Sequence, residues 1–209
     1  MLLRLFVVAI FGVFTLAQQT QTRRDPVEYI KTLESERRVA GLHVAQVVES
    51  LKIGQGQRVA DLGSGSGLFT RPIAKVVGDK GVVYAIDIDP DLLKHVEKTA
   101  RDEQLTNIRT VLAIESDPKL PEAVDLIAII DTLHHIDNRP TYLSNLKRYL
   151  RPGGRIAIID FSETWPVGHE AMRYSFADLQ SWMEKGGYER SEKFDFLTNN
   201  FFVVYRLKP

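Results

Sequence analysis

Apolar stretches with the pattern of buried β-strands alternate with stretches of helical periodicity along most of the chain. The predicted helices lie near Leu68–Val77, Asp91–Gln104 and Thr141–Leu150. Strands that alternate with helices are typical of a parallel sheet covered by helices on both faces. The predicted strands are Arg58–Leu62, Val82–Asp87, Ile108–Ala113, Val124–Ile130 and Arg155–Phe161.

The two ends of the folded region depart from this alternation. Before the first strand, Pro26–Leu51 has the apolar spacing of a helix. After the last parallel strand, a helix is predicted over Phe176–Lys185, followed by strands Glu192–Leu197 and Phe201–Leu207. Only residues 198–200 separate these two strands, so we expect them to form an antiparallel hairpin. The pattern therefore predicts an α/β fold whose mostly parallel sheet ends in an antiparallel C-terminal hairpin.

The first residues have the arrangement of a secretory signal peptide. Arg4 supplies positive charge, Leu5–Phe14 is an uninterrupted apolar run, and a polar segment begins at Gln18. The apolar segment is shorter than the roughly 18 residues of a membrane-spanning helix. We therefore expect cleavage after Ala17, with an uncleaved membrane anchor or an ordinary N-terminal helix as the alternatives.

This segment determines the expected domain organisation and location. Residues 1–17 are predicted to be a signal peptide or membrane anchor, and residues 18–34 a polar linker with the start of a helix. Residues 35–209 are predicted to form the folded domain. We expect the protein to be exported, to the periplasm or the medium, or to associate with the membrane through residues 1–17. A cytoplasmic location is the alternative.

Composition excludes several classes of function. The 209 residues suffice for one domain with a sizeable core. Lys+Arg and Asp+Glu are both 27, so the chain lacks the basic excess that binding to a phosphate backbone requires. There is no cysteine, which excludes disulfides, thiolate metal sites and cysteine nucleophiles. We therefore expect no nucleic-acid partner.

A glycine-rich loop follows the first predicted strand, where the chain turns into a helix. Gly63, Gly65 and Gly67 allow backbone N–H groups to approach a ligand closely. A dinucleotide-binding loop that starts at Gly63 needs its third glycine at the position of Leu68. Asp61 lies just before the loop, where its carboxylate can pair with an ammonium group. The loop therefore favours a ligand that carries an amino-acid moiety over a dinucleotide.

A second carboxylate, Asp87, ends the second predicted strand, where it can accept both hydroxyls of a ribose. With the glycine loop, Asp61 and Asp87 together, the chain resembles the class I S-adenosylmethionine-dependent methyltransferases. Within that family it is similar to the small-molecule, type 11 members. Val59–Gly67 is similar to the first motif of the family and Val83–Asp87 to its ribose-binding strand. Asp125–His135 is similar to the fourth-strand motif and Leu150–Ile158 to the fifth. The resemblance implies a three-layer Rossmann-like fold with a seven-stranded sheet, and S-adenosyl-L-methionine as the cofactor.

The resemblance also implies which residues contact that cofactor. Members of the family commonly carry an acidic residue after the third strand that binds the adenine amino group, and here we favour Asp117 over its neighbour Glu115. Asp131 ends the fourth strand at the edge where open α/β sheets bind ligands, so it either contacts the cofactor or orders its own loop. The full predicted set is Asp61, Gly63, Gly65, Gly67, Asp87, Asp117 and Asp131.

Two adjacent histidines are the candidates for catalysis. His134 and His135 follow the fourth strand, and either acts as an acid or base or both serve packing of the loop. We expect no metal site at this pair, because neighbouring side chains point in different directions and no third ligand is evident in the sequence.

The expected reaction is transfer of the sulfonium methyl group to a small-molecule acceptor. The second hypothesis is a non-catalytic S-adenosylmethionine-binding sensor or interaction module with the same fold. A nucleotide-dependent oxidoreductase is a third, and Leu68 and Asp61 argue against it. Cofactor binding separates the third hypothesis from the first two, and turnover separates an enzyme from a sensor.

Overall fold

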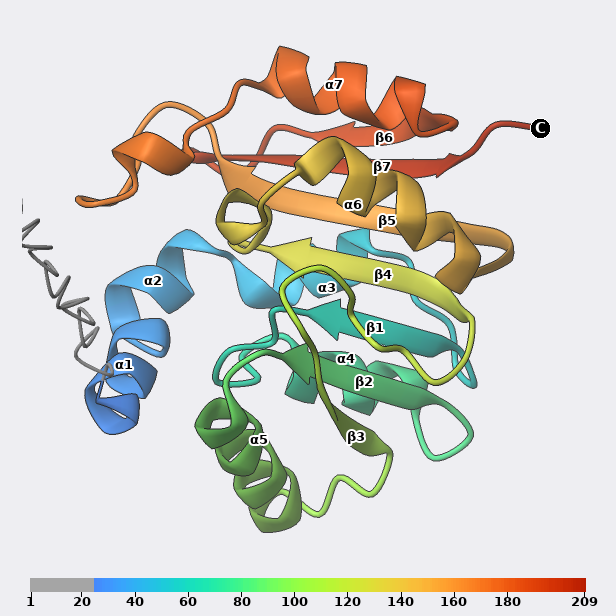
Figure 1. Cartoon of the computed structure of the whole chain (residues 1–209). Helices are drawn as coiled ribbons and strands as arrows, with labels where there is room; N and C mark the ends of the chain where they lie inside the picture. Colours follow the sequence, from blue (N-terminus) through green and yellow to red (C-terminus); the bar gives the residue numbers. More distant parts are fainter. Residues whose placement is uncertain (1–24) are drawn as a thin grey trace, which may run out of the picture.

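A computed structural model gives the structure of residues 25–209, in which one seven-stranded sheet forms the centre of the molecule (Figure 1). The strand order is β3-β2-β1-β4-β5-β7-β6. Neighbours among the first five strands are parallel, whereas β7 is antiparallel to both β5 and β6. The strands are β1 (Arg58–Leu62), β2 (Val82–Asp87), β3 (Ile108–Leu112), β4 (Val124–Ile130), β5 (Leu150–Phe161), β6 (Tyr188–Phe194) and β7 (Asn200–Leu207).

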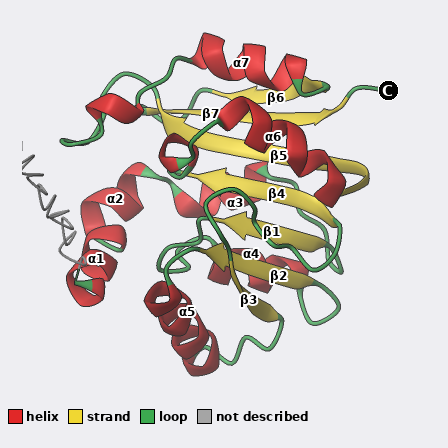
Figure 2. Ribbon diagram, in the orientation of Figure 1, coloured by secondary structure: helices red, strands yellow, loops and turns green. Residues whose placement is uncertain are grey.

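Helices cover both faces of this sheet, which gives the three layers expected from the sequence (Figure 2). The α-helices are α1 (Pro26–Leu33), α2 (Glu36–Gly41), α3 (Val44–Ser50), α4 (Thr70–Val77), α5 (Pro90–Asp102), α6 (Arg139–Leu146) and α7 (Phe176–Lys185). Short 3₁₀ turns lie at η1 (Leu133–His135), η2 (Lys147–Tyr149) and η3 (Glu170–Met172).

Each face of the sheet has its own apolar core because both sets of side chains on the central strands are apolar. In β1, Ala60 and Leu62 belong to the same apolar core as residues of α6 and α7, whereas Val59 belongs to the core that includes residues of α3 and α4. Alternate residues of a strand point to opposite faces, so a strand buried on both faces has a continuous apolar sequence. That pattern made the central strands predictable.

The N-terminal helical region is divided, in contrast to the single helical pattern predicted over Pro26–Leu51. The first break lies at Ser35, whose backbone is extended, and the second at His43, which has a left-handed conformation with φ of 45°. A left-handed residue cannot continue a right-handed helix, so α2 and α3 are separate elements with different directions. The region is helical over nearly the whole predicted range, but it forms three helices rather than one.

The boundaries around β5 and β6 also differ from the prediction. The predicted helix Thr141–Leu150 ends earlier, because Leu150 already pairs with Val124 of β4. The predicted strand Glu192–Leu197 lies earlier, at β6, which forms the edge of the sheet. Tyr188 is the one buried residue of β6, so this strand has little of the apolar pattern from which a strand is recognised.

The connection order creates one topological switch point. From β1 the chain continues through β2 and β3 on one side, and then crosses to β4 and β5 on the other side. Open α/β sheets bind ligands at the carboxyl ends of the strands beside such a point. In this protein the ends of β1, β2 and β4 therefore mark where a ligand site is expected.

The prediction for residues 1–17 lies outside the described residues. Within residues 25–209, no helix is both long enough and apolar enough to cross a membrane.

Candidate active site

The glycine-rich loop connects the end of β1 to α4 at the switch point. Gly63, Gly65 and Gly67 all have positive φ angles, of 76°, 54° and 80°. The N–H groups of Gly63 and Ser64 both donate to the carbonyl of Ile86 in β2, which holds the loop against the neighbouring strand. Gly63 also lacks room for a side chain, since a Cβ there would lie 2.2 Å from Cγ2 of Thr132. The loop geometry thus depends on glycine at this position.

Asp87 lies at the end of β2, beside the glycine loop, as predicted. One carboxylate oxygen accepts from the N–H of Gly65 at 2.9 Å, and the other accepts from the N–H of Asp89 at 3.0 Å. Burial raises the pKa of the Asp87 carboxyl, and these two hydrogen bonds oppose the shift. The cap of α5 is Asp89, which accepts from the N–H of Asp91, so Asp87 is not needed for that role.

Asp61 is a buried carboxylate on the other side of the same loop. It is only 3% exposed, and Oδ2 accepts a hydrogen bond of 2.5 Å from the hydroxyl of Thr70 at the start of α4. Burial raises the pKa of Asp61 to about 6, against the effect of the Thr70 hydrogen bond. The charged form would be stabilised by a cation placed beside it.

Both carboxylates line a pocket of about 420 Å³ together with the glycine loop. Its wall includes Ser64 and Ser66, whose hydroxyl oxygens are buried within the protein rather than exposed to the pocket. The N-terminal helices complete the wall with Tyr29, Leu33 and Arg38.

Asp131 follows β4 and also lines the pocket, but both of its oxygens already have partners. Arg38 of α2 binds one oxygen at 2.9 Å, and the side-chain amide of Asn200 in β7 donates to the other at 2.9 Å. Burial raises the pKa of Asp131, and the charge of Arg38 opposes this. Asp131 therefore joins the N-terminal helices and the C-terminal hairpin to the edge of the sheet.

Asp117 does not lie at the pocket. Its carboxylate accepts from the hydroxyl of Tyr149 at 2.7 Å and binds the guanidinium of Arg148 at 2.6 Å, on the other side of its loop. Glu115, the neighbour that we disfavoured, lines the pocket instead, next to Ile114. The turn between these positions separates the two acidic side chains, because Ile114 and Asp117 form a short backbone bridge.

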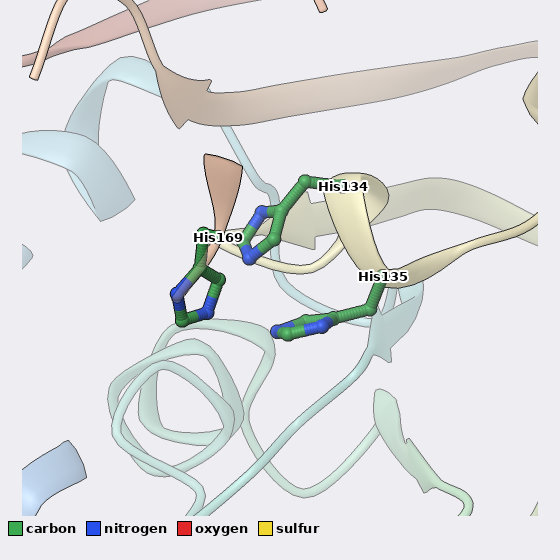
Figure 3. A group of neighbouring side chains, drawn as sticks. All are labelled: His134, His135 and His169. Atoms are coloured by element: carbon green, nitrogen blue, oxygen red, sulfur yellow. The ribbon is translucent and has the colours of Figure 1, made fainter. Parts of the chain in front are cut away.

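The two candidate catalytic histidines occupy different environments. His134 is 2% exposed, and its Nδ1 lies 2.7 Å from Oδ1 of the fully buried Asp160. His135 is exposed and lines the pocket described above. Figure 3 shows that the ring of His169, from the loop after β5, lies beside both of them. His169 lies far from the pair along the chain, so only the tertiary fold shows that the three rings meet.

Comparisons with known proteins identify the family. Residues 60–158 match a family described as a methyltransferase domain. A solved S-adenosylmethionine-dependent methyltransferase from Aquifex aeolicus is 26% identical, with a TM-score of 0.77 over 88% of this chain and 98% of the other. Residues 60–158 thus form a methyltransferase domain, and the chain is similar to S-adenosylmethionine-dependent methyltransferases. The predicted fold is thereby confirmed, and S-adenosyl-L-methionine is the cofactor that this family implies.

The methyltransferase chain also has curated relatives. A ubiquinone/menaquinone biosynthesis C-methyltransferase from Shewanella pealeana is 32% identical over 139 residues, which is 63% of this chain and 54% of the relative. A protein of the same name from Methylococcus capsulatus is 28% identical over 197 residues, which covers 76% of this chain and 77% of the relative. The chain thus spans about half the length of the first relative and more of the second.

S-adenosylmethionine fits the groups that line the pocket. Asp61 offers a buried carboxylate for the ammonium group, and Asp87 offers acceptors at the position of a ribose. The two carboxylates are therefore complementary to the ammonium group and the ribose hydroxyls of this cofactor.

Proposed function

We propose that the protein transfers the methyl group of S-adenosylmethionine to a small-molecule acceptor. The observation that carries this proposal is the pocket at the switch point, where Asp61 and Asp87 flank the glycine loop. The match to this family supports the same cofactor. The apolar part of the pocket wall, which includes Leu33, Ile136 and Tyr142, supports an acceptor of largely apolar character.

The protein side chains contribute binding, orientation and exclusion of water. When bound, the cofactor supplies an electrophilic methyl group on a sulfonium. Asp87 holds the ribose end and Asp61 the amino-acid end, so the reacting group has a fixed direction. The helices α1 and α2 cover the pocket with Tyr29, Leu33 and Arg38. Alignment of the acceptor in line with the methyl group then provides much of the rate enhancement.

For the acceptor, we propose a ring carbon of a quinol-type compound. The curated relatives are named C-methyltransferases of ubiquinone and menaquinone biosynthesis, which supports carbon methylation in this chain. The aromatic and aliphatic residues in the pocket wall are compatible with a flat apolar ring. Phenolic oxygen acceptors of similar shape are the nearest alternative, and the test includes them.

The test is transfer of labelled methyl from S-adenosylmethionine to a panel of quinols with an unsubstituted ring position and to matched phenols. We expect label on carbon of at least one quinol, and loss of transfer in Asp87→Ala. Tight cofactor binding without transfer to the panel or to any component of a metabolite extract would contradict the proposal. That result would instead support the non-catalytic sensor.

A further inference from the structure

Three imidazole rings meet at the edge of the cofactor pocket. His134 and His135 come from η1, and His169 comes from the loop that leads into η3 (Figure 3). Each ring offers one nitrogen, and these three nitrogens lie within 4.8 Å of one another. The ring centroids of His134 and His169 are 5.2 Å apart, and those of His135 and His169 are 5.3 Å apart.

We propose that His134, His135 and His169 bind a divalent transition-metal ion, with Zn²⁺ as the best match. Three imidazoles with an open fourth position form a known class of zinc site. Tetrahedral Zn–N bonds of 2.0–2.1 Å separate the ligand nitrogens by about 3.3 Å. The rings therefore need to close by only about an ångström and a half around an ion, which side-chain rotations can supply. His169 is a third ring that was not evident beside the pair in the sequence, and the proposal therefore departs from our expectation of no metal site there.

His134 is oriented by a second residue in the way that metal-binding histidines usually are. The Asp160 carboxylate, 2.7 Å from Nδ1, also accepts from the N–H groups of His134 and Phe161 and from the Tyr174 hydroxyl. A carboxylate that faces Nδ1 places the ring proton on that nitrogen, so Nε2 has its lone pair available for a metal. Carboxylate–histidine–metal arrangements of this kind fix the ring and raise its basicity.

The loop that supplies His169 is tied to the other two ligands. Arg139 donates from Nη2 to the carbonyl of His134 at 2.6 Å and to the carbonyl of Met172 at 3.0 Å. This guanidinium therefore joins η1 to η3, which follows His169 directly. The packing of Trp165 against His134, with centroids 5.6 Å apart, adds an apolar wall on this side. The third ligand is thus positioned by the fold rather than by a chance approach of a loose loop.

The metal site adjoins the methyl-transfer pocket but does not depend on it. His135 lines that pocket, so an ion held by the three rings would lie at its edge. A neutral imidazole cluster prefers Zn²⁺, Ni²⁺ or Cu²⁺, whereas Mg²⁺ prefers oxygen ligands. The proposal therefore predicts selectivity among ions that can be measured without cofactor or acceptor.

The experiment is a titration of the tag-free full chain with Zn²⁺, using a competing chromophoric chelator and no S-adenosylmethionine. We expect one Zn²⁺ per chain and no competition from Mg²⁺. His169→Ala removes a half-buried ligand and should weaken Zn²⁺ binding about 10–100-fold, the range for disturbing a ligand shell. Zn²⁺ should also raise the melting temperature of the wild-type protein but not of His169→Ala.

His43→Asn is the matched control. It removes a histidine that packs on Phe196, away from the three rings, and asparagine tolerates the left-handed backbone at this position. This variant should bind Zn²⁺ like the wild type. The proposal is overturned if the wild-type chain binds no stoichiometric Zn²⁺, or if His169→Ala and His43→Asn bind it equally well. Cofactor binding measured on the same samples shows whether each variant is folded and tests the methyl-transfer pocket separately.

Discussion

Asp61 has opposite effects on stability and on binding. Its buried carboxyl has a pKa of about 6, so at neutral pH the free protein holds a poorly solvated charge. Asp61→Asn removes that charge and retains an oxygen to accept from Thr70. We expect this variant to bind S-adenosylmethionine at least about tenfold more weakly, while its free energy of unfolding at about pH 8 rises by on the order of 2 kcal/mol. Calorimetric titration and urea unfolding measure the two effects.

The pH dependence of stability and of cofactor affinity, measured for the wild type and for Asp61→Asn, is the control for this prediction. A raised pKa means that protonated Asp61 favours the folded state below about pH 4, and that this contribution is lost as the pH rises through about 6. Cofactor affinity follows the opposite course, because the ionised carboxylate pairs with the ammonium group above about pH 6. Affinity of the wild type should therefore fall below this pH, and that of Asp61→Asn should not. Parallel pH profiles for the two proteins would remove Asp61 from the site.

Glu115 and Asp117 provide a second test at the residue scale. Glu115 lines the pocket, whereas Asp117 is held by Tyr149 and Arg148. We expect Glu115→Gln to weaken cofactor binding by about 0.5–1.5 kcal/mol, the range for one hydrogen bond, and Asp117→Asn to leave it unchanged. Calorimetry of the two variants decides between them. The reverse order of effects would support the assignment of Asp117 that the sequence favoured.

The sequence allowed prediction of those site residues that lie in one continuous motif. Asp61 lies near the end of β1, the loop glycines follow that strand, and Asp87 ends β2, so the local sequence alone places them at the same edge of the sheet. Arg38, Asn200 and His169 come from distant segments that only the tertiary fold brings to the pocket edge. Nothing in the local sequence around these three residues indicates their partners.

At the scale of elements, Gly63 in the glycine loop and Gly153 in β5 form a matched pair of positions for substitution. Gly63 and Gly153 have almost the same left-handed φ, 76° and 78°. A Cβ at Gly63 would overlap Thr132, whereas a Cβ at Gly153 would meet nothing within 4 Å. Both alanine variants pay the backbone cost of about 1–2 kcal/mol. Gly63→Ala should lose about 1–3 kcal/mol more, from overpacking, and should also lose cofactor binding.

Chemical unfolding and cofactor titration of the two alanine variants check this expectation. Equal stability and equal affinity in both would show that the contact of the loop with Thr132 can relax. The pair separates steric fit from backbone conformation, because only the former differs between the two positions.

The elements themselves were predictable to different degrees for a physical reason. Strands β1, β2 and β4 are buried on both faces, so most of their residues are apolar, and Asp61, Asp87 and Asp125 are the acidic exceptions. Strand β6 lies at the sheet edge with one buried side chain, and its position is determined by pairing with β7 rather than by its own pattern. Pairing is a non-local interaction, which the sequence of a single segment does not contain.

At the scale of the whole molecule, we propose that residues 1–17 direct export or membrane association. The proposal is supported by Arg4, the apolar run from Leu5 and the junction after Ala17. We expect the protein isolated from its native host to lack residues 1–17, or to fractionate with the membrane if they are retained. Intact-mass measurement after cell fractionation tests this. A full-length chain in the cytoplasm would contradict the proposal and leave the methyltransferase assignment unchanged.

We propose that the pocket at the switch point binds S-adenosylmethionine in preference to a dinucleotide. A calorimetric titration of the purified protein with S-adenosylmethionine and, separately, with NAD tests this. The glycine spacing, the buried Asp61 beside the loop and the absence of a glycine at Leu68 all predict saturable binding of S-adenosylmethionine and far weaker binding of NAD. Tighter binding of NAD, or no binding of S-adenosylmethionine by the folded protein, would contradict the account.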